Sequence, residues 1–144
     1  MEILPASLRD LGALRTLEHA CFDRDAWSLL DLVAVLTFPE VVRLKAVLDS
    51  RMVGFAAGDP RASQGFAWIA TIGVHPDYQR RGIGRSLLRA CEVQLKIPRL
   101  RLTVRMSNSA ALALYEREGY RTVEIWKGYY SDGEDGVVME KNRT

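Results

Sequence analysis

The segment Gln79–Gly84 holds the residue types of this sequence that are best suited to bind a small anion. It reads Gln-Arg-Arg-Gly-Ile-Gly, and it stands between an apolar run ending at Val74 and an amphipathic stretch beginning at Ile83. The first turn of a helix carries backbone N–H groups without intrahelical partners, and the helix dipole adds positive character there. A strand that passes through a glycine turn into a helix therefore predicts a phosphate-binding loop.

The composition of this segment narrows the choice of phosphate ligand. Gly82 and Gly84 let a phosphate approach without a Cβ in the way, and Arg80, Arg81 and Arg85 add positive charge. The segment lacks the Gly-Lys-Ser/Thr of nucleotide triphosphate loops and does not match the Gly-x-Gly-x-x-Gly dinucleotide pattern, so ATP and NAD are disfavoured. The alternative interpretation is a solvated Arg-Arg-Gly turn before an ordinary amphipathic helix.

Apolar periodicity and capping residues predict the elements that position this loop. Ser7 and Ser28 each open a helix with the capping-box pattern, Asn108 can cap a third, and Gly119 suits a left-handed helix end. Residues 66–74 are apolar on both strand faces, which is typical of a central strand. Together the patterns predict strands over residues 2–4, 41–48, 52–57, 66–74, 99–105, 120–126 and 136–139. They predict helices over residues 8–21, 28–38 and 108–118, and one that begins at residue 82 and ends before Pro98. Residues 58–65 are predicted to form a loop.

Size and composition predict one soluble domain over residues 1–144. The chain is 48% apolar and 26% charged, and its net charge of +2 with a pI near 8.7 is too small to indicate a nucleic-acid surface. No signal peptide or apolar stretch of membrane-spanning length is present, so we expect a cytoplasmic protein that binds no membrane. Cys21 and Cys91 fall in helical apolar patterns and are expected to pack in the core. His19 and His75 lack ligand-type neighbours, so no metal site is expected.

The sequence resembles the GNAT acetyltransferase superfamily over nearly its whole length. The family motif Gln/Arg-x-x-Gly-x-Gly/Ala matches Gln79–Gly84, and the order βααβββαβαββ matches the predicted elements. Residues 72–85 and 104–115 look like ribosomal-protein alanine N-acetyltransferases, and residues 129–135 look like the catalytic subunits of N-terminal acetyltransferases. The resemblance implies an α/β (α+β) fold with a central mixed, mostly antiparallel sheet flanked by helices.

The resemblance also implies acetyl-CoA as cosubstrate and a role for each matching residue. The pantetheine arm would bind along the fourth strand at Ile72, Gly73 and Val74, and Tyr115 would protonate the departing thiolate as the catalytic acid. Asn108 would touch the cofactor arm or serve only as a helix cap. Loop aromatics would contact the acceptor: Phe22, Trp27, Tyr129 and Tyr130, of which Phe22 and Trp27 suit core packing equally. The pyrophosphate would lie on Gln79, Arg80, Arg81, Gly82, Ile83, Gly84 and Arg85.

Thr103 is the departure from the family pattern, because this strand position commonly carries a Glu or His as general base. A threonine cannot take that role. Base duty then falls either on a water relay, alone or aided by a carboxylate of Glu18, Asp23 or Asp25, or on His75. At pH 7 about 10% of an α-amine of pKa about 7.7 to 8.0 is neutral, against about 0.04% of a lysine of pKa about 10.4. A weak base therefore favours an N-terminal amine as acceptor.

The function predicted from the sequence is acetyl transfer from acetyl-CoA to a protein N-terminal α-amine by direct attack. Acetylation of a lysine side chain or a small-molecule amine is the alternative within the enzyme class. A weakly active cofactor-binding regulatory subunit is the alternative outside it, and Thr103 is the residue that keeps it open. We expect a monomer or homodimer, and a partner subunit is compatible with the resemblance.

Overall fold

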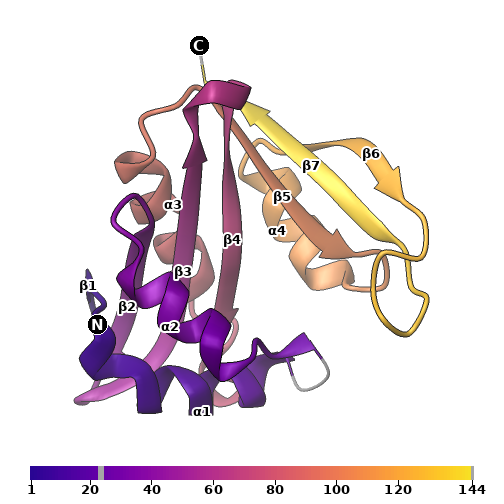
Figure 1. Ribbon diagram of the computed structural model, residues 1–144. Coiled ribbons are helices and arrows are strands. Elements are labelled where there is room, and N and C mark those ends of the chain that lie inside the picture. The colour runs from indigo at the N-terminus through magenta and orange to yellow at the C-terminus, as the bar shows by residue number, and fades with distance from the viewer. Residues whose placement is uncertain (23–24, 144) are drawn as a thin grey trace. The chain divides into compact units, whose positions relative to one another are not determined.

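The computed structural model describes residues 1–22 and 25–143, apart from the side chain of Ala62. Its helices and strands follow the predicted order βααβββαβαββ (Figure 1). The strands pair in the order β1-β2-β3-β4-β5-β7-β6, with β4 central as predicted. The elements are β1 (Glu2–Pro5), α1 (Leu11–Phe22), α2 (Leu29–Thr37), β2 (Val42–Leu48), β3 (Arg51–Arg61), β4 (Phe66–Val74), α3 (Ile83–Gln94), β5 (Arg99–Arg105), α4 (Ser109–Arg117), β6 (Arg121–Trp126) and β7 (Gly136–Asn142).

The chain divides into two compact units, which are described separately. The first comprises residues 1–60 and 69–96, and the second comprises residues 61–68 and 97–144. The boundary runs through β4, whose first three residues belong to the second unit. The pairing of β4 with β5 is parallel, with Ala67 opposite Leu100 and Trp68 opposite Arg101.

In the first unit, helices cover both faces of the strands because β3 is apolar on both faces. Phe55 and Ala57 belong to the core cluster formed with α1 and α2, which also contains Leu14, Leu17, Leu32, Val35 and Leu36. Gly54 and Gly58 point to the opposite face, towards α3. A Cβ at Gly58 would lie 2.5 Å from Leu95 Cδ1, so glycine is what lets α3 approach β3 this closely.

The side-chain alternation of β4 is interrupted in its second half. Ala70 faces the α2 side, and the Cβ direction of Gly73 points at Cys21 and Phe22 of α1, on the same face. Residues three apart in a regular strand face opposite sides, so β4 carries an extra residue between them, as in a β-bulge. A regular alternation over residues 66–74, which would keep Ala70 opposite the odd-numbered residues throughout, therefore does not extend beyond Ala70.

In the second unit, β5 separates two faces. Leu100, Leu102 and Val104 are buried, whereas Arg99, Arg101, Thr103 and Arg105 are half-buried on the other face. β7 pairs with β5 along its whole length and with β6 on its other edge, both antiparallel. This register places Thr103 opposite Val138 and Arg101 opposite Glu140, with which Arg101 forms a 2.9 Å ion pair.

The main errors of the sequence prediction concern where elements begin and end. Strand β3 continues through Arg61. The first half of the predicted loop over 58–65 is therefore strand, because β3 extends beyond the apolar run that predicted it. Strand β7 likewise continues three residues past Met139. The first helix is split into a 3-10 turn, Leu8–Asp10, and α1, although the Ser7 capping box forms as predicted.

Candidate active site

The turn before α3 has the geometry of an anion-binding loop. Arg80 and Gly82 adopt left-handed backbone conformations, with φ of 64° and 79°. Such residues curl the chain so that neighbouring N–H groups point towards one place. The first intrahelical hydrogen bond runs from Ser86 N to Gly82 O over 3.0 Å, so the N–H groups of residues 83–85 lie ahead of the helical ladder. A Cβ at Gly82 would meet nothing within 4 Å, so glycine is favoured there by φ and not by space.

Side chains tie this turn to the end of β4. Gln79 Nε2 donates a 3.2 Å hydrogen bond to Val74 O, and His75 N donates to Val53 O on the neighbouring strand over 2.8 Å. His75 Nδ1 accepts from Asp77 N over 3.1 Å, which caps the short 3-10 turn Pro76–Tyr78. His75 therefore shapes the passage from strand to loop, and Gln79 fixes the loop on the strand.

The interrupted part of β4 lies against the end of α1. A Cβ at Gly73 would come within 3.0 Å of the Phe22 ring and 3.2 Å of Cys21 Sγ. Gly73 thus makes room for two side chains of α1, a packing reason that the sequence alone did not indicate. Burial, reinforced by nearby Glu18, raises the pKa of the Cys21 thiol to about 11, so Cys21 is a packed thiol and not a nucleophile. The Cys91 thiol is fully buried, and burial raises its pKa to about 12.

Glu18 is a buried carboxyl that anchors the segment between α1 and α2. Only 4% of its surface is exposed, and its Oε1 accepts a 3.2 Å hydrogen bond from Trp27 N. Burial raises the pKa of Glu18, and the Trp27 N–H partly offsets this effect. Glu18 therefore positions Trp27. Of the other base candidates, Asp25 is half-buried, and Asp23 lies outside the described residues.

Tyr115 and Asn108 occupy the two ends of α4 in the second unit. Asn108 caps the helix, since its Oδ1 accepts from Ala111 N over 3.2 Å. Tyr115 is 9% exposed, and its ring packs against Tyr120 with centroids 5.9 Å apart. Burial, with a contribution from Tyr130, raises the pKa of Tyr115 to about 12. Tyr115 is therefore a neutral phenol that can donate a hydrogen bond throughout the physiological pH range.

Thr103 lies beside the loop that joins β6 to β7. A Cβ at the facing Gly136 would come within 3.0 Å of Thr103 Cγ2 and 3.2 Å of the Tyr129 ring, so both side chains pack over this glycine. Tyr129 is 53% exposed and stacks at a tilt on Trp126 and edge-on against Tyr130. The position expected to hold a general base thus adjoins the two tyrosines expected to contact the acceptor.

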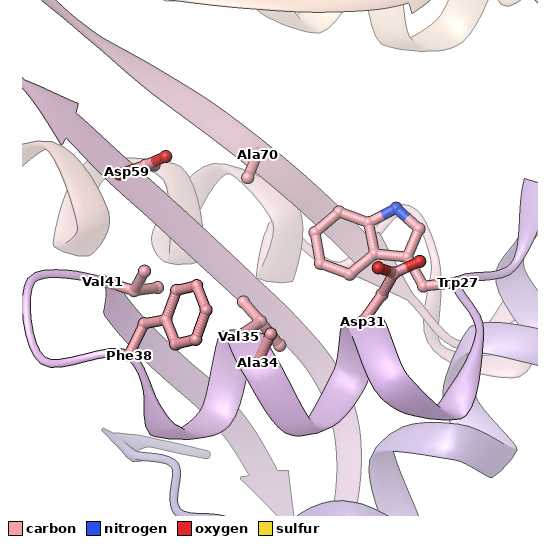
Figure 2. Close-up of a pocket in the computed structure, with 8 residues that line it drawn as sticks. All are labelled: Trp27, Asp31, Ala34, Val35, Phe38, Val41, Asp59 and Ala70. Carbon is pink, nitrogen blue, oxygen red and sulfur yellow. The ribbon is translucent and has the colours of Figure 1, made fainter.

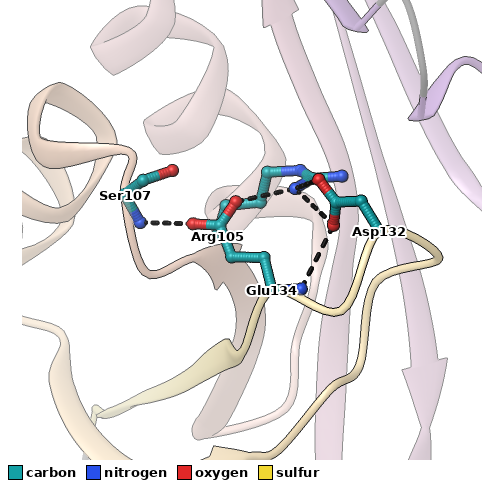
Figure 3. Close-up of polar contacts among 4 residues, drawn as sticks. All are labelled: Arg105, Ser107, Asp132 and Glu134. Atoms are coloured by element: carbon teal, nitrogen blue, oxygen red, sulfur yellow. Dashed lines mark hydrogen bonds and ion pairs between the residues drawn. The ribbon is translucent and has the colours of Figure 1, made fainter.

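An ion-paired network holds that loop in place (Figure 3). Arg105 Nη1 contacts Asp132 Oδ2 at 3.0 Å and Glu134 Oε1 at 2.7 Å, and Glu134 Oε2 accepts from Ser107 N over 2.7 Å. The Arg105 guanidinium lies 4.2 Å from the centroid of the Tyr130 ring. Hydrogen bonds from Ser107 and Arg105 hold the pKa of Glu134 below its usual value.

This network was not predicted from the sequence. Arg105 and Glu134 are 29 residues apart, and charge spacing along the chain predicts pairs only within one helix or hairpin.

The predicted site residues fall into two groups, one in each compact unit. Residues 72–74 and 79–85 lie in the first unit with Phe22 and Trp27, and the second unit holds Thr103, Asn108, Tyr115, Tyr129 and Tyr130.

Metal ligation and membrane insertion find no support in the described part of the chain. Among residues 1–22 and 25–143, no group of three or more His, Cys, Asp or Glu side chains is arranged to hold a metal ion. No helix within these ranges is long and apolar enough to span a bilayer.

Comparison with known families decides what kind of protein carries this loop. The model of the acetyltransferase (GNAT) family matches residues 11–120, which include β4, the Gln79–Gly84 turn and Tyr115. The chain belongs to the GNAT acetyltransferase family. The mixed sheet flanked by four helices agrees with this fold.

Individual relatives are also similar to this chain in sequence. The N-alpha-acetyltransferase of Saccharolobus solfataricus is 34% identical over 112 residues, 67% of this chain and 66% of that protein. The ribosomal protein bS18 alanine N-acetyltransferase of Salmonella typhimurium is 38% identical over 104 residues, 68% of this chain and 69% of that enzyme. The aligned region thus spans about two thirds of these relatives.

The solved structures extend the likeness to the whole chain. The ribosomal-protein-S18-alanine N-acetyltransferase of Escherichia coli superposes with a TM-score of 0.89 at 30% identity, covering 99% of this chain and 94% of that one. The structure of Arabidopsis thaliana NAA60 in complex with acetyl-CoA shares the fold, with a TM-score of 0.82 at 19% identity over 98% of this chain and 97% of that one. These likenesses extend the family assignment to the fold of the whole chain.

Proposed function

We propose that this GNAT protein transfers the acetyl group of acetyl-CoA to the α-amino group of a polypeptide. The observation that carries the proposal is the turn from Gln79 to Gly82, whose two left-handed residues precede the unpaired first-turn amides of α3. This geometry suits a pyrophosphate, and the arginines at positions 80, 81 and 85 suit its charge. The names of the relatives support a protein N-terminus as the acceptor.

In this proposal the cofactor arm binds along the second half of β4. Residues 72–74 follow the interruption after Ala70, and bulged strands present backbone N–H and C=O groups that a regular ladder would pair. The arm would add to the strand through these groups, as peptides add to sheet edges. Asn108 uses its side-chain oxygen as a helix cap, so its NH₂ group is the part that would contact the arm.

The proposed chemical step is direct attack of the neutral amine on the thioester carbonyl carbon. A C–N bond forms, the C–S bond breaks, the amine nitrogen loses one proton to water, and the coenzyme leaves as a thiol or thiolate. The amide of Val74 would hold the oxyanion, and Tyr115 would hydrogen-bond the sulfur as charge develops there. A water relay suffices as base because an α-amine is partly neutral near pH 7.

The acceptor side of the proposal rests on aromatic residues. Tyr129 and Tyr130 lie in a loop fixed by Arg105, and Trp27 lies in a segment fixed by Glu18. Phe22 packs on Gly73, beside the part of β4 that is proposed to bind the cofactor arm. Aromatic walls held rigidly in this way suit a peptide, whose backbone they can flank at low entropic cost.

The family match crosses both compact units, and this supports one GNAT domain over residues 1–144. We place the enzyme in the cytoplasm, as a monomer or homodimer without nucleic acid or membrane contact. A relative named for acetylating a ribosomal protein supports the cytoplasmic setting.

The test is an activity assay with purified protein, acetyl-CoA and peptides that differ at their first two residues. We expect thiol release with some of these peptides, and mass spectrometry should locate the acetyl group on the α-amine. Free lysine derivatives and spermidine serve as competing acceptors. Turnover of these amines alone would show that the acceptor is a small molecule. No turnover at all would favour a regulatory subunit, which Thr103 at the position of the usual base would suit.

A further inference from the structure

A hollow in the first unit lies between α2 and the strands β3 and β4 (Figure 2). Its volume is about 350 Å³, at the small end of the roughly 300 to 1,000 Å³ found for ligand pockets. It is thus large enough for one or two side chains of a partner. The lining residues are Trp27, Asp31, Ala34, Val35, Phe38, Val41, Asp59 and Ala70.

The walls of this hollow are apolar and open to solvent. Phe38, at the C-terminal end of α2, is 60% exposed, and Ala70 on β4 is also exposed. Figure 2 shows Trp27 at one end of the hollow and Phe38 at the other, with Ala34 and Val35 between them. Two aromatic rings around an aliphatic floor fit a long side chain that has a methylene stem.

The charged residues that line the hollow are both acidic. Asp31 Oδ2 accepts a 2.9 Å hydrogen bond from Ser28 Oγ, and Asp31 N donates to the same hydroxyl over 3.2 Å, so the carboxylate is fixed on the first turn of α2. A carboxylate has about four acceptor positions and can therefore take a further donor. Asp59 stands at the opposite end of the hollow from Asp31 (Figure 2). Two carboxylates on apolar walls, in a chain of net charge +2, indicate a cationic ligand.

We propose that this hollow binds an arginine side chain of the acceptor polypeptide, downstream of its acetylated amino terminus. The inference rests on the proposed function and assigns to it a class of substrate. A guanidinium can pair with Asp31 while its flat face stacks on Trp27 at the same end of the hollow, a combination that the smaller ammonium group of lysine matches less well. Trp27 belongs to the predicted acceptor side as well as to the hollow, so one aromatic residue links the two.

The experiment compares pairs of peptides that share one good amino terminus and differ by arginine or citrulline at one position from 3 to 6. Citrulline keeps the shape of arginine and removes its charge. With saturating acetyl-CoA, we expect kcat/KM to be about five- to tenfold higher for the arginine peptide at one position or more, through KM. Raising the salt concentration should reduce this ratio, and that measurement needs no variant.

The double variant D31N/D59N should bring the arginine to citrulline ratio to within twofold of one. Asn keeps the hydrogen-bonding capacity of each site, so the caps around Ser28 remain possible. The matched control is D49N, which removes one negative charge in the β2–β3 turn, where the left-handed φ of 51° suits Asn. This control should keep the ratio of the wild-type enzyme.

Several results would overturn the proposal. If the peptides are acetylated but the arginine to citrulline ratio of kcat/KM is near one at every position, arginine binding in the hollow is refuted and the proposed function stands. A ratio that D31N/D59N does not change has the same consequence. If no peptide is acetylated, the proposed function fails, and calorimetric titration with the same peptide pairs still tests the hollow: equal affinities refute it. Acetylation of spermidine that depends on Asp31 and Asp59, without peptide turnover, would assign the hollow to a small polyamine.

Discussion

Tyr115 shows how the environment of one residue limits its chemistry. Its pKa of about 12 lies some 3.5 units above the pKa of about 8.5 of an ordinary thiol. Complete proton transfer from this phenol to a thiolate would therefore be uphill by about 5 kcal/mol. The role that fits is a hydrogen bond to the sulfur while negative charge develops, and the departing thiolate then takes its proton from water. This refines the acid role implied by the family resemblance.

Replacement of Tyr115 by Phe should lower kcat about 100-fold and leave the KM for acetyl-CoA within about threefold. Because the raised pKa keeps the phenol protonated below about 12, the factor should be the same from pH 6 to pH 9. Steady-state kinetics at several pH values measures both quantities.

The matched control is Y120F, which removes the hydroxyl of the neighbouring buried ring and should change kcat by less than threefold. Equal melting temperatures of the two variants would exclude a folding effect. Full activity of the Tyr115 variant would remove this residue from the mechanism.

At this scale, the sequence was informative where a residue acts through its type and its neighbours in the chain. The cap at Asn108, the capping box at Ser7 and the left-handed Gly119 follow local rules, and the structure confirms all three. Gly73 was different, because its reason lies in Cys21 and Phe22, some fifty residues away. Contacts of that kind depend on tertiary packing.

Among the elements, the β6–β7 loop is the part of the site with the densest polar contacts. Arg105 joins Asp132, Glu134 and the Tyr130 ring, and Asp135 accepts from Gly128 N and pairs with Lys127. Contacts of this kind fix the position of a loop before a ligand arrives, which lowers the entropy cost of binding.

Replacement of Arg105 by Ala should raise the KM for peptide about tenfold and change the KM for acetyl-CoA less than twofold, because the tyrosines lose their fixed position. R105K should recover only part of the loss, since lysine cannot pair with two carboxylates and stack on Tyr130 at once. Kinetics with the peptide and the cofactor varied in turn separates the two effects.

Arg99 provides the matched control, because it lies on the same strand and pairs with Glu140, away from the loop. R99A should leave both KM values within twofold of those of the wild-type enzyme. An equal rise in peptide KM for R99A and R105A would show a general effect of lost charge and contradict the positioning role.

Element order could be predicted from the sequence because helices and strands here have strong periodicities and clear caps. The predicted strand over 99–105 and the central strand over 66–74 have the bounds of β5 and β4. Periodicity could not show that β4 is interrupted after Ala70, since one extra residue changes no composition. Nor could it show that β3 runs on through Asp59 and Pro60 to Arg61, residue types that usually end strands.

For the whole molecule, the acceptor is the question that matters most, and the argument for an α-amine comes from acid–base chemistry. Thr103 offers no base, so the proposed direct attack needs an amine that is already partly neutral. The acetyl transfer rate should therefore rise with pH towards the pKa of the α-amine, near 8, and then level off. A lysine side chain would keep the rate rising towards pH 10.

The most direct test uses one peptide that contains both a free α-amine and an internal lysine. After incubation with acetyl-CoA at pH 7.5, tandem mass spectrometry locates the acetyl group. We expect it on the α-amine in nearly all product molecules, and we expect no product from the same peptide with a blocked amino terminus. Acetylation of the internal lysine at a comparable rate, in either peptide, would contradict this expectation.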